Sequence, residues 1–260
     1  MAGQPQATPL LELAERAERL GFDSVWVGDS LLARPRHEPL TLLAAVASRV
    51  RRVDIGTAVL LPALLTAASV PFEKRVGRLL EGLRLARSLW SGKPVDWDGR
   101  WKVEHGVLGP TPYRQGGPPI WIGGSLPASL DRAGRFFDGW LPIAPDADQW
   151  ARLWNEVKEI ARTAGRNPNA LTGAMYVTVI SDEDRSRANE RLNAYLEQYY
   201  GQPAAVMRSR QACYAGPIEP LAEWLQGYAR AGATHLVLRF AGDHERHLEA
   251  VAALRSKLAY

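Results

Sequence analysis

A carboxylate closes a short apolar segment near the start of the chain. In residues 23–29, Val25 and Val27 alternate with other side chains, as in a short strand, and the segment ends at Asp29. In enzymes built from alternating strands and helices, catalytic side chains lie at the carboxyl ends of the strands. We therefore expect Asp29 to be catalytic, although an aspartate at this place could equally cap the segment that follows.

A second segment has the composition of an anion site. Gly123, Gly124 and Ser125 follow the strand-like residues 119–122 and precede a helix-like stretch. Unpaired N–H groups at a helix N-terminus bind phosphate, and glycines leave the backbone open to the ligand. The pattern predicts a phosphate-binding turn with Ser125 at the N-cap and the Ser129 hydroxyl as a further donor. An ordinary strand-to-helix turn with a serine cap is the alternative.

A third segment could support a flat ring system. Gly56, Thr57 and Ala58 lie in the strand-like residues 53–61 and carry small side chains, which would let a ring lie against the backbone. Tryptophans could form the walls of such a site, although tryptophans in strands more often pack in the core. The candidates are Trp26, Trp101, Trp121 and Trp140.

Other common types of site find no support. The five histidines are scattered along the chain, so we expect no metal site. The sequence has no G-x-S-x-G nucleophile motif, no Walker phosphate loop and no Gly-rich dinucleotide fingerprint.

Strand-like and helix-like segments alternate along the chain, which indicates a parallel sheet with helices packed outside it. Strands are predicted at 23–28, 53–61, 119–122, 139–143, 171–180 and 234–240, and a hairpin at 95–107 that turns at Asp98-Gly99. Helices are predicted at 9–20, 39–50, 72–90, 126–136, 148–164, 182–200, 218–231 and 244–258. No linker composition is present, so residues 1–260 are predicted to form a single domain. A closed barrel needs eight strands, and periodicity alone does not separate a barrel from an open, doubly wound sheet.

The charge of the chain argues against a nucleic-acid partner. Its 32 basic and 28 acidic residues give a net charge of +4, and the two signs are interspersed. No apolar window is long enough to span a bilayer, and no signal peptide is visible. One cysteine, Cys213, fits a reducing compartment and is expected to be a small buried residue. We expect a cytoplasmic protein that acts on a small molecule.

Together these segments resemble the bacterial luciferase-like monooxygenase superfamily, especially its branch that uses the deazaflavin coenzyme F420. The similarity runs in the family's order over nearly the whole chain. The matching stretches are 13–29, 55–59, 71–75, 86–90, 118–125, 137–142 and 214–238. The resemblance implies a (β/α)8 TIM-type barrel that binds a flavin or deazaflavin at the C-terminal rim of its strands.

The resemblance also implies roles for individual residues. Thr57, Ala58 and Val59 would back the ring of the cofactor, and the Ala58–Val59 bond matches a position where family members often have a non-proline cis peptide. Gly123, Gly124 and Ser125 match the site of the cofactor phosphate. Asp29 matches a carboxylate near the polar edge of the ring.

The chain departs from the family pattern in two ways. The first strand is absent, and the fourth strand is absent with the helix before it, so that residues 60–70 lead directly into the next helix. A barrel without these strands would expose unpaired edges, which favours the interpretation that the natural protein contains residues missing from this sequence. Several family members have a histidine directly after the carboxylate, where this chain has Ser30, and serine cannot act as a base near pH 7.

The resemblance therefore predicts an oxidoreductase that transfers hydride between F420 and a small organic substrate. A monooxygenase that uses flavin mononucleotide (FMN) and oxygen is the first alternative, and a non-catalytic flavin-binding relative is the second. Because dimers are common in the family, a homodimer is possible.

Overall fold

The structure is a computed structural model that describes residues 6–28, 37–58 and 71–254. The chain divides into two compact units, one of Met1–Glu15 with Asp23–Pro119 and the other of Arg16–Phe22 with Ile120–Tyr260. Asp29, Ser30 and Val59 lie outside the described residues.

The first unit contains a small parallel sheet. Strands β1 (Ser24–Val27) and β2 (Asp54–Thr57) pair in parallel, with Ser24 opposite Asp54 and Val27 opposite Thr57. Helix α1 (Thr8–Arg19) begins in this unit, and helix α2 (Pro39–Arg49) connects the two strands. A core of buried apolar side chains joins these elements: Ala14, Val46, Val50 and Val53.

A helix and a hairpin complete the first unit. The 3-10 helix η1 (Phe72–Lys74) leads into α4 (Arg75–Leu89), and β3 (Val95–Asp98) pairs antiparallel with β4 (Lys102–Gly106). The predicted hairpin is confirmed. The buried carboxylate of Glu81 on α4 accepts a 2.6 Å hydrogen bond from the backbone N–H of Arg100 and forms an ion pair with its guanidinium, which anchors the turn to the helix.

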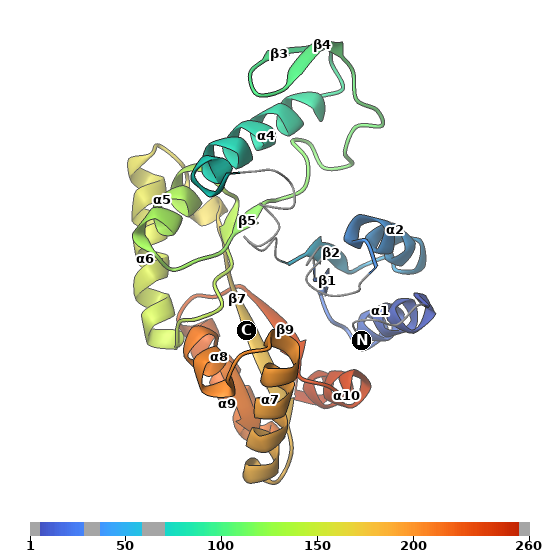
Figure 1. The fold of residues 1–260 in the computed structure, drawn as a ribbon, viewed down its shortest axis with the longest axis vertical. Helices are drawn as coiled ribbons and strands as arrows, with labels where there is room; N and C mark the ends of the chain where they lie inside the picture. The colour runs from blue at the N-terminus through green and yellow to red at the C-terminus, as the bar shows by residue number, and fades with distance from the viewer. Residues whose placement is uncertain (1–5, 29–36, 59–70, 255–260) are drawn as a thin grey trace. The chain divides into compact units, whose positions relative to one another are not determined.

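The second unit is built on a five-stranded parallel sheet (Figure 1). Its strands are β5 (Trp121–Ile122), β6 (Gly139–Trp140), β7 (Thr172–Ser181), β8 (Cys213–Gly216) and β9 (His235–Phe240). The long strand β7 organises the sheet: β6 pairs with its first residues, β8 with its last four, and β9 with Ala174–Val179. Because all pairings are parallel, the carboxyl ends of these strands point toward one edge of the sheet, although β6 ends with Trp140 opposite Gly173, near the start of β7.

Helices cover both faces of β7. The elements are α5 (Pro127–Phe136), α6 (Ala147–Thr163), η2 (Pro168–Ala170), α7 (Arg185–Tyr200), α8 (Ala204–Arg210), α9 (Ile218–Arg230) and α10 (His244–Leu254). A Cβ atom at Gly173 would lie 2.8 Å from the ring of Trp154 on α6, whereas Ile180 packs in a core cluster with Leu192 of α7. Odd and even positions of a strand face opposite sides, so α6 and α7 cover different faces.

Each of the six strands predicted from the alternation overlaps an observed one, but most are shorter. Strand β8 and helix α8 are additional elements that periodicity did not predict, because both are short. Within the described residues the strands do not close into a barrel. Over the same residues, none of the helices combines the length and the apolar character that a membrane crossing requires.

Candidate functional site

The turn between β5 and α5 carries a row of unpaired backbone donors. Strand β5 ends at Ile122, and α5 begins at Pro127. Between them, the N–H groups of Gly123, Gly124 and Ser125 donate no hydrogen bond to any other described residue. They precede a helix N-terminus, where the peptide dipoles favour negative charge. This arrangement can bind an anionic group, and phosphate fits it.

Close packing fixes the shape of this turn. Gly124 has a φ of +95°, a conformation that side chains with a Cβ rarely adopt. A Cβ atom there would lie 2.8 Å from the Ser129 hydroxyl oxygen, and one on Gly123 would lie 3.0 Å from the carbonyl oxygen of Leu141. On the carbonyl side, the indole N–H of the buried Trp140 donates to the Gly124 oxygen at 2.8 Å. Space therefore favours glycine at both positions, and backbone conformation favours it at Gly124 as well.

The predicted helix cap is wrong by one residue. Leu126 occupies the N-cap of α5, and no side chain caps it. Proline is favoured at the first helical position, so Pro127 places the cap at the residue directly before it and leaves Ser125 outside the helix. Ser129 accepts a 3.1 Å hydrogen bond from the guanidinium of Arg132. Arg132 brings a positive charge to the first turns of α5, and its i+3 spacing from Ser129 was the signal that sequence reasoning missed.

The first unit holds the other predicted cofactor residues. Thr57 ends β2 opposite Val27, and the Ala58 N–H donates to the Val27 oxygen at 2.9 Å. The space beside Gly56 is filled from within the sheet, since a Cβ atom there would lie 2.6 Å from the ring of Trp26. On the side to which a Cβ would point, the backbone at Gly56 is thus covered by Trp26. The Ala58–Val59 bond and Asp29 are not among the described residues.

The two predicted tryptophans of the second unit, Trp121 and Trp140, lie on different faces of its sheet. Trp140 is fully buried and stacks on Trp154, with ring centroids 6.4 Å apart, so it is a core residue on the α6 side. Trp121 lies on the other face, where its ring meets the edge of His235 at 5.1 Å. Of the two predicted wall residues in this unit, Trp121 alone stands on the face opposite to α6.

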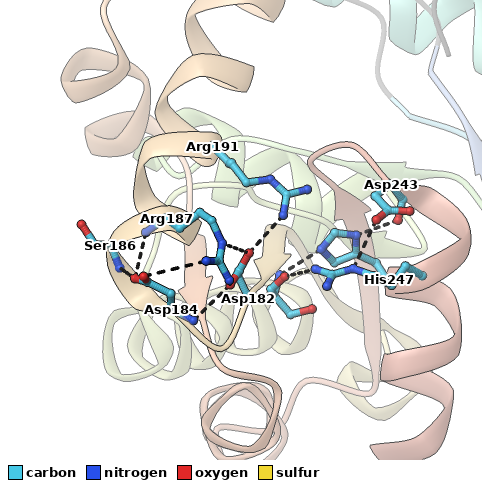
Figure 2. Close-up of polar contacts among 9 residues, drawn as sticks. Asp182, Asp184, Ser186, Arg187, Arg191, Asp243 and His247 are labelled. Carbon is cyan, nitrogen blue, oxygen red and sulfur yellow. Dashed lines mark hydrogen bonds and ion pairs between the residues drawn. The ribbon is translucent and has the colours of Figure 1, made fainter.

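A charged cluster follows the end of β7 (Figure 2). The carboxylate of Asp182 accepts hydrogen bonds from Arg187 Nε at 2.8 Å and from Arg191 at 3.2 Å, and a further one from the Asp184 N–H at 3.0 Å. The hydrogen bonds from Arg187, more than any other contact, hold the pKa of Asp182 well below its usual range. Asp182 is therefore ionised near neutral pH and is not a proton donor. Residues 182, 187 and 191 lie close together in the sequence, but their spacing alone does not indicate that the three side chains meet.

His247 occupies the other side of the same cluster. Its Nε2 accepts from the Ser181 N–H at 2.9 Å, and its Nδ1 lies 2.7 Å from the Asp243 carbonyl oxygen, so the neutral ring donates there (Figure 2). The side chain is 1% exposed, and burial lowers its pKa. Because both ring nitrogens form hydrogen bonds, His247 connects α10 to the end of β7 and has a structural role.

Two expected absences concern metal and thiol chemistry. No group of three or more metal-ligating side chains is found in the part of the chain that the structure describes. Cys213 is partly buried, and burial raises the pKa of its thiol to about 11, which does not suit a nucleophile.

Comparison with known sequences identifies related proteins. A family model for luciferase-like monooxygenases matches residues 1–70 and 62–260. The two matches overlap at residues 62–70, where the sequence predicts that a strand of the family is absent. An F420-dependent glucose-6-phosphate dehydrogenase of Mycolicibacterium gilvum is 28% identical, with 92% of this chain and 90% of that protein covered. An F420-dependent hydroxymycolic acid dehydrogenase of Mycobacterium tuberculosis is 28% identical, with 84% and 72% covered.

Solved structures share the fold at low sequence identity. An F420-dependent secondary alcohol dehydrogenase, in complex with an F420–acetone adduct, matches with a TM-score of 0.82 at 19% identity, over 99% of this chain and 96% of that one. A riboflavin lyase with modified FMN and riboflavin matches with a TM-score of 0.77 at 13% identity, over 97% and 85%. The predicted fold class, an α/β fold of the luciferase-like barrel type, is confirmed.

Proposed function

The chain belongs to the luciferase-like monooxygenase family, and we propose that it is an oxidoreductase that transfers hydride between coenzyme F420 and a small organic substrate. The turn at Gly123–Ser125 carries this proposal, because its unpaired amides and the α5 N-terminus suit the phosphate of such a cofactor. The F420-dependent dehydrogenases among the relatives support the choice of cofactor.

In this proposal the protein binds and orients, and the deazaflavin, when bound, supplies the hydride chemistry. The N–H groups of Gly123, Gly124 and Ser125 would hold the phosphate, with Arg132 adding positive charge nearby. The end of β2 at Thr57 and Ala58, continued by Val59, would back the ring. Asp29 would contact the polar edge of the ring, and the base that several family members have after this carboxylate is replaced by Ser30.

FMN is the second candidate cofactor, and a specific observation favours keeping it. The riboflavin lyase structure that shares this fold contains a modified FMN. FMN also carries a phosphate, so the turn at Gly123–Ser125 suits both molecules. With FMN the reaction would use oxygen, whereas a deazaflavin transfers hydride and reacts poorly with oxygen.

A binding titration separates the candidates. F420 and FMN are added separately to the purified protein while tryptophan fluorescence is followed. Binding of F420 alone supports the proposal, binding of FMN alone favours the monooxygenase, and binding of neither favours a non-catalytic relative. The variant Ser125→Asp places a negative charge in the turn and should weaken binding of the preferred cofactor about tenfold or more. Ser48→Asp, on the exposed surface of α2, is the matched control and should leave binding unchanged.

The wider setting of the enzyme is part of the same proposal. We take residues 1–260 as one barrel domain that acts on a small molecule, with a possible homodimer. The single cysteine supports a reducing compartment such as the cytoplasm.

A further inference from the structure

Arg239 lies among tyrosines at the carboxyl end of β9. It sits opposite Thr178 in the sheet. Its Nε donates to the Tyr195 hydroxyl at 3.0 Å, its Nη1 donates to the Tyr200 hydroxyl at 2.8 Å, and its guanidinium carbon lies 3.7 Å from the ring centre of Tyr199. The three tyrosines belong to the last turns of α7, so this helix covers Arg239 on the face opposite to α6.

Two buried donors in this cluster are unpaired. Nη2 of Arg239 is buried and has no hydrogen-bond partner in the described structure. Gln211 is 4% exposed; its oxygen accepts from the Thr178 and Tyr200 hydroxyls, both at 3.3 Å, but its Nε2 has no partner there either. The Tyr200 hydroxyl links the two side chains, since it accepts from Arg239 and donates to Gln211. Buried donors without acceptors are costly, so a pair of them indicates a site for a group that supplies acceptors.

Within the described part of the chain, the cluster lacks negative charge as well as hydrogen-bond acceptors. No carboxylate among the described residues forms an ion pair with Arg239. The phenols of Tyr176 and Tyr195 do not supply negative charge, because burial raises the pKa of Tyr176 to about 12 and also raises that of Tyr195. Arg239 is therefore a largely buried cation whose neighbours are neutral hydroxyls and aromatic rings. The missing acceptor is best supplied by an anion.

The position of the cluster suits a ligand. Arg239 is the penultimate residue of β9, at the edge of the sheet where the carboxyl ends of the parallel strands lie. The carboxyl ends of parallel strands are where α/β enzymes bind their ligands. We propose that Arg239 and Gln211 form an oxyanion site that holds a carboxylate or phosphate group of the substrate. The substrate role rests on the proposed function, whereas the binding of an anion does not.

The first test measures anion binding directly. Inorganic phosphate and, separately, acetate are titrated into the Ser125→Asp protein by calorimetry, so that the turn after β5 does not contribute. The variant Gln211→Glu supplies Arg239 with a carboxylate of the protein's own. It should fold, unfold at a higher temperature and lose at least tenfold in affinity for whichever anion the parent binds. Gln198→Glu, on the exposed side of α7, is the matched control and should keep that affinity.

The outcomes of this test distinguish a phosphorylated substrate from a carboxylic acid, and a failure of the anion site from a failure of the proposed function. Tighter binding of phosphate identifies a phosphorylated substrate, and tighter binding of acetate identifies a carboxylic acid. Absence of anion binding in the parent, or equal binding by Gln211→Glu, would show that water alone occupies the site and would overturn the proposal. Gln211→Glu in the otherwise unaltered protein should leave the affinity for F420 unchanged. If this variant loses as much affinity for F420 as it loses for the anion, the cluster belongs to the cofactor site instead. Anion binding without F420 binding would refute the proposed function and leave the anion site standing.

Discussion

Replacing Gly124 by alanine tests the turn on which the proposed function depends. The residue has a φ of +95°, and a left-handed backbone costs a side chain with a Cβ about 1–2 kcal/mol. The new methyl group would also lie 2.8 Å from the Ser129 hydroxyl oxygen, and overpacking of this kind costs about 1–3 kcal/mol. The two contributions together predict a loss of about 2–5 kcal/mol in the free energy of unfolding.

The matched control is Gly165→Ala at the end of α6. Gly165 has a φ of +73°, and nothing lies within 4 Å of a Cβ atom built there, so this variant carries the backbone cost without the contact. Equilibrium urea unfolding should therefore show a larger loss for Gly124→Ala by about 1–3 kcal/mol. For a chain of this size, each kcal/mol corresponds to about 2–4 °C in Tm.

Binding should separate the same two variants. Because the clash must shift the turn, Gly124→Ala should weaken F420 binding about tenfold in a fluorescence titration, which is about 1.4 kcal/mol. Gly165→Ala should bind as the parent does. Adding Ser129→Ala removes the nearer contact atom and should recover part of the lost stability. Equal stability losses in Gly124→Ala and Gly165→Ala, together with unchanged F420 binding, would refute both the packing argument and the assignment of the turn.

Three further predictions concern the second unit. Because burial lowers the pKa of His247, the unfolded state binds more protons than the folded state below about pH 6.5, and the free energy of unfolding should fall as the pH decreases from there. Urea unfolding at several pH values measures this pH dependence, which should be weaker in His247→Gln. Gly173→Ala should cost about 1–3 kcal/mol, measured the same way, because the added methyl group meets the ring of Trp154; a neutral result would contradict the close approach of α6. Tyr228→Phe should cost about 1 kcal/mol in thermal unfolding, since the buried hydroxyl donates to the Pro145 oxygen at 2.9 Å; an unchanged Tm would show that this hydrogen bond contributes nothing.

The sequence predicted the regular elements well because their signals are local. Alternation located β7 and β9, and helical periodicity located α6 and α9, with ends that differ from the predicted ones by at most one residue. Strand β8 has four residues and follows a seven-residue helix, so neither segment is long enough to show a period. Its place in the sheet is decided by pairing with the end of β7, a contact between residues more than 30 positions apart.

The candidate site was predictable in its backbone and not in its side chains. The Gly-Gly-Ser turn before a helix predicted unpaired amides at Gly123–Ser125, and the structure has them. The Arg239 cluster could not be predicted in this way, because it joins residues of α7, β9 and the segment before β8 that have no common spacing. Only tertiary packing buries the charge of Arg239.

The three tryptophans that pack on the α6 side of the sheet give this protein an internal optical reference. Trp140, Trp150 and Trp154 are buried within ring-centroid distances of 5.6–6.4 Å, and they are three of the nine tryptophans in the chain. Indole transitions at this separation couple, so the near-ultraviolet circular dichroism should be dominated by this stack and should be lost when the second unit unfolds. The stack lies on the face opposite to Trp121 and Arg239, so ligands bound on that side should leave its signal intact. A titration that quenches emission and preserves the dichroism would then report an occupied site in a folded protein.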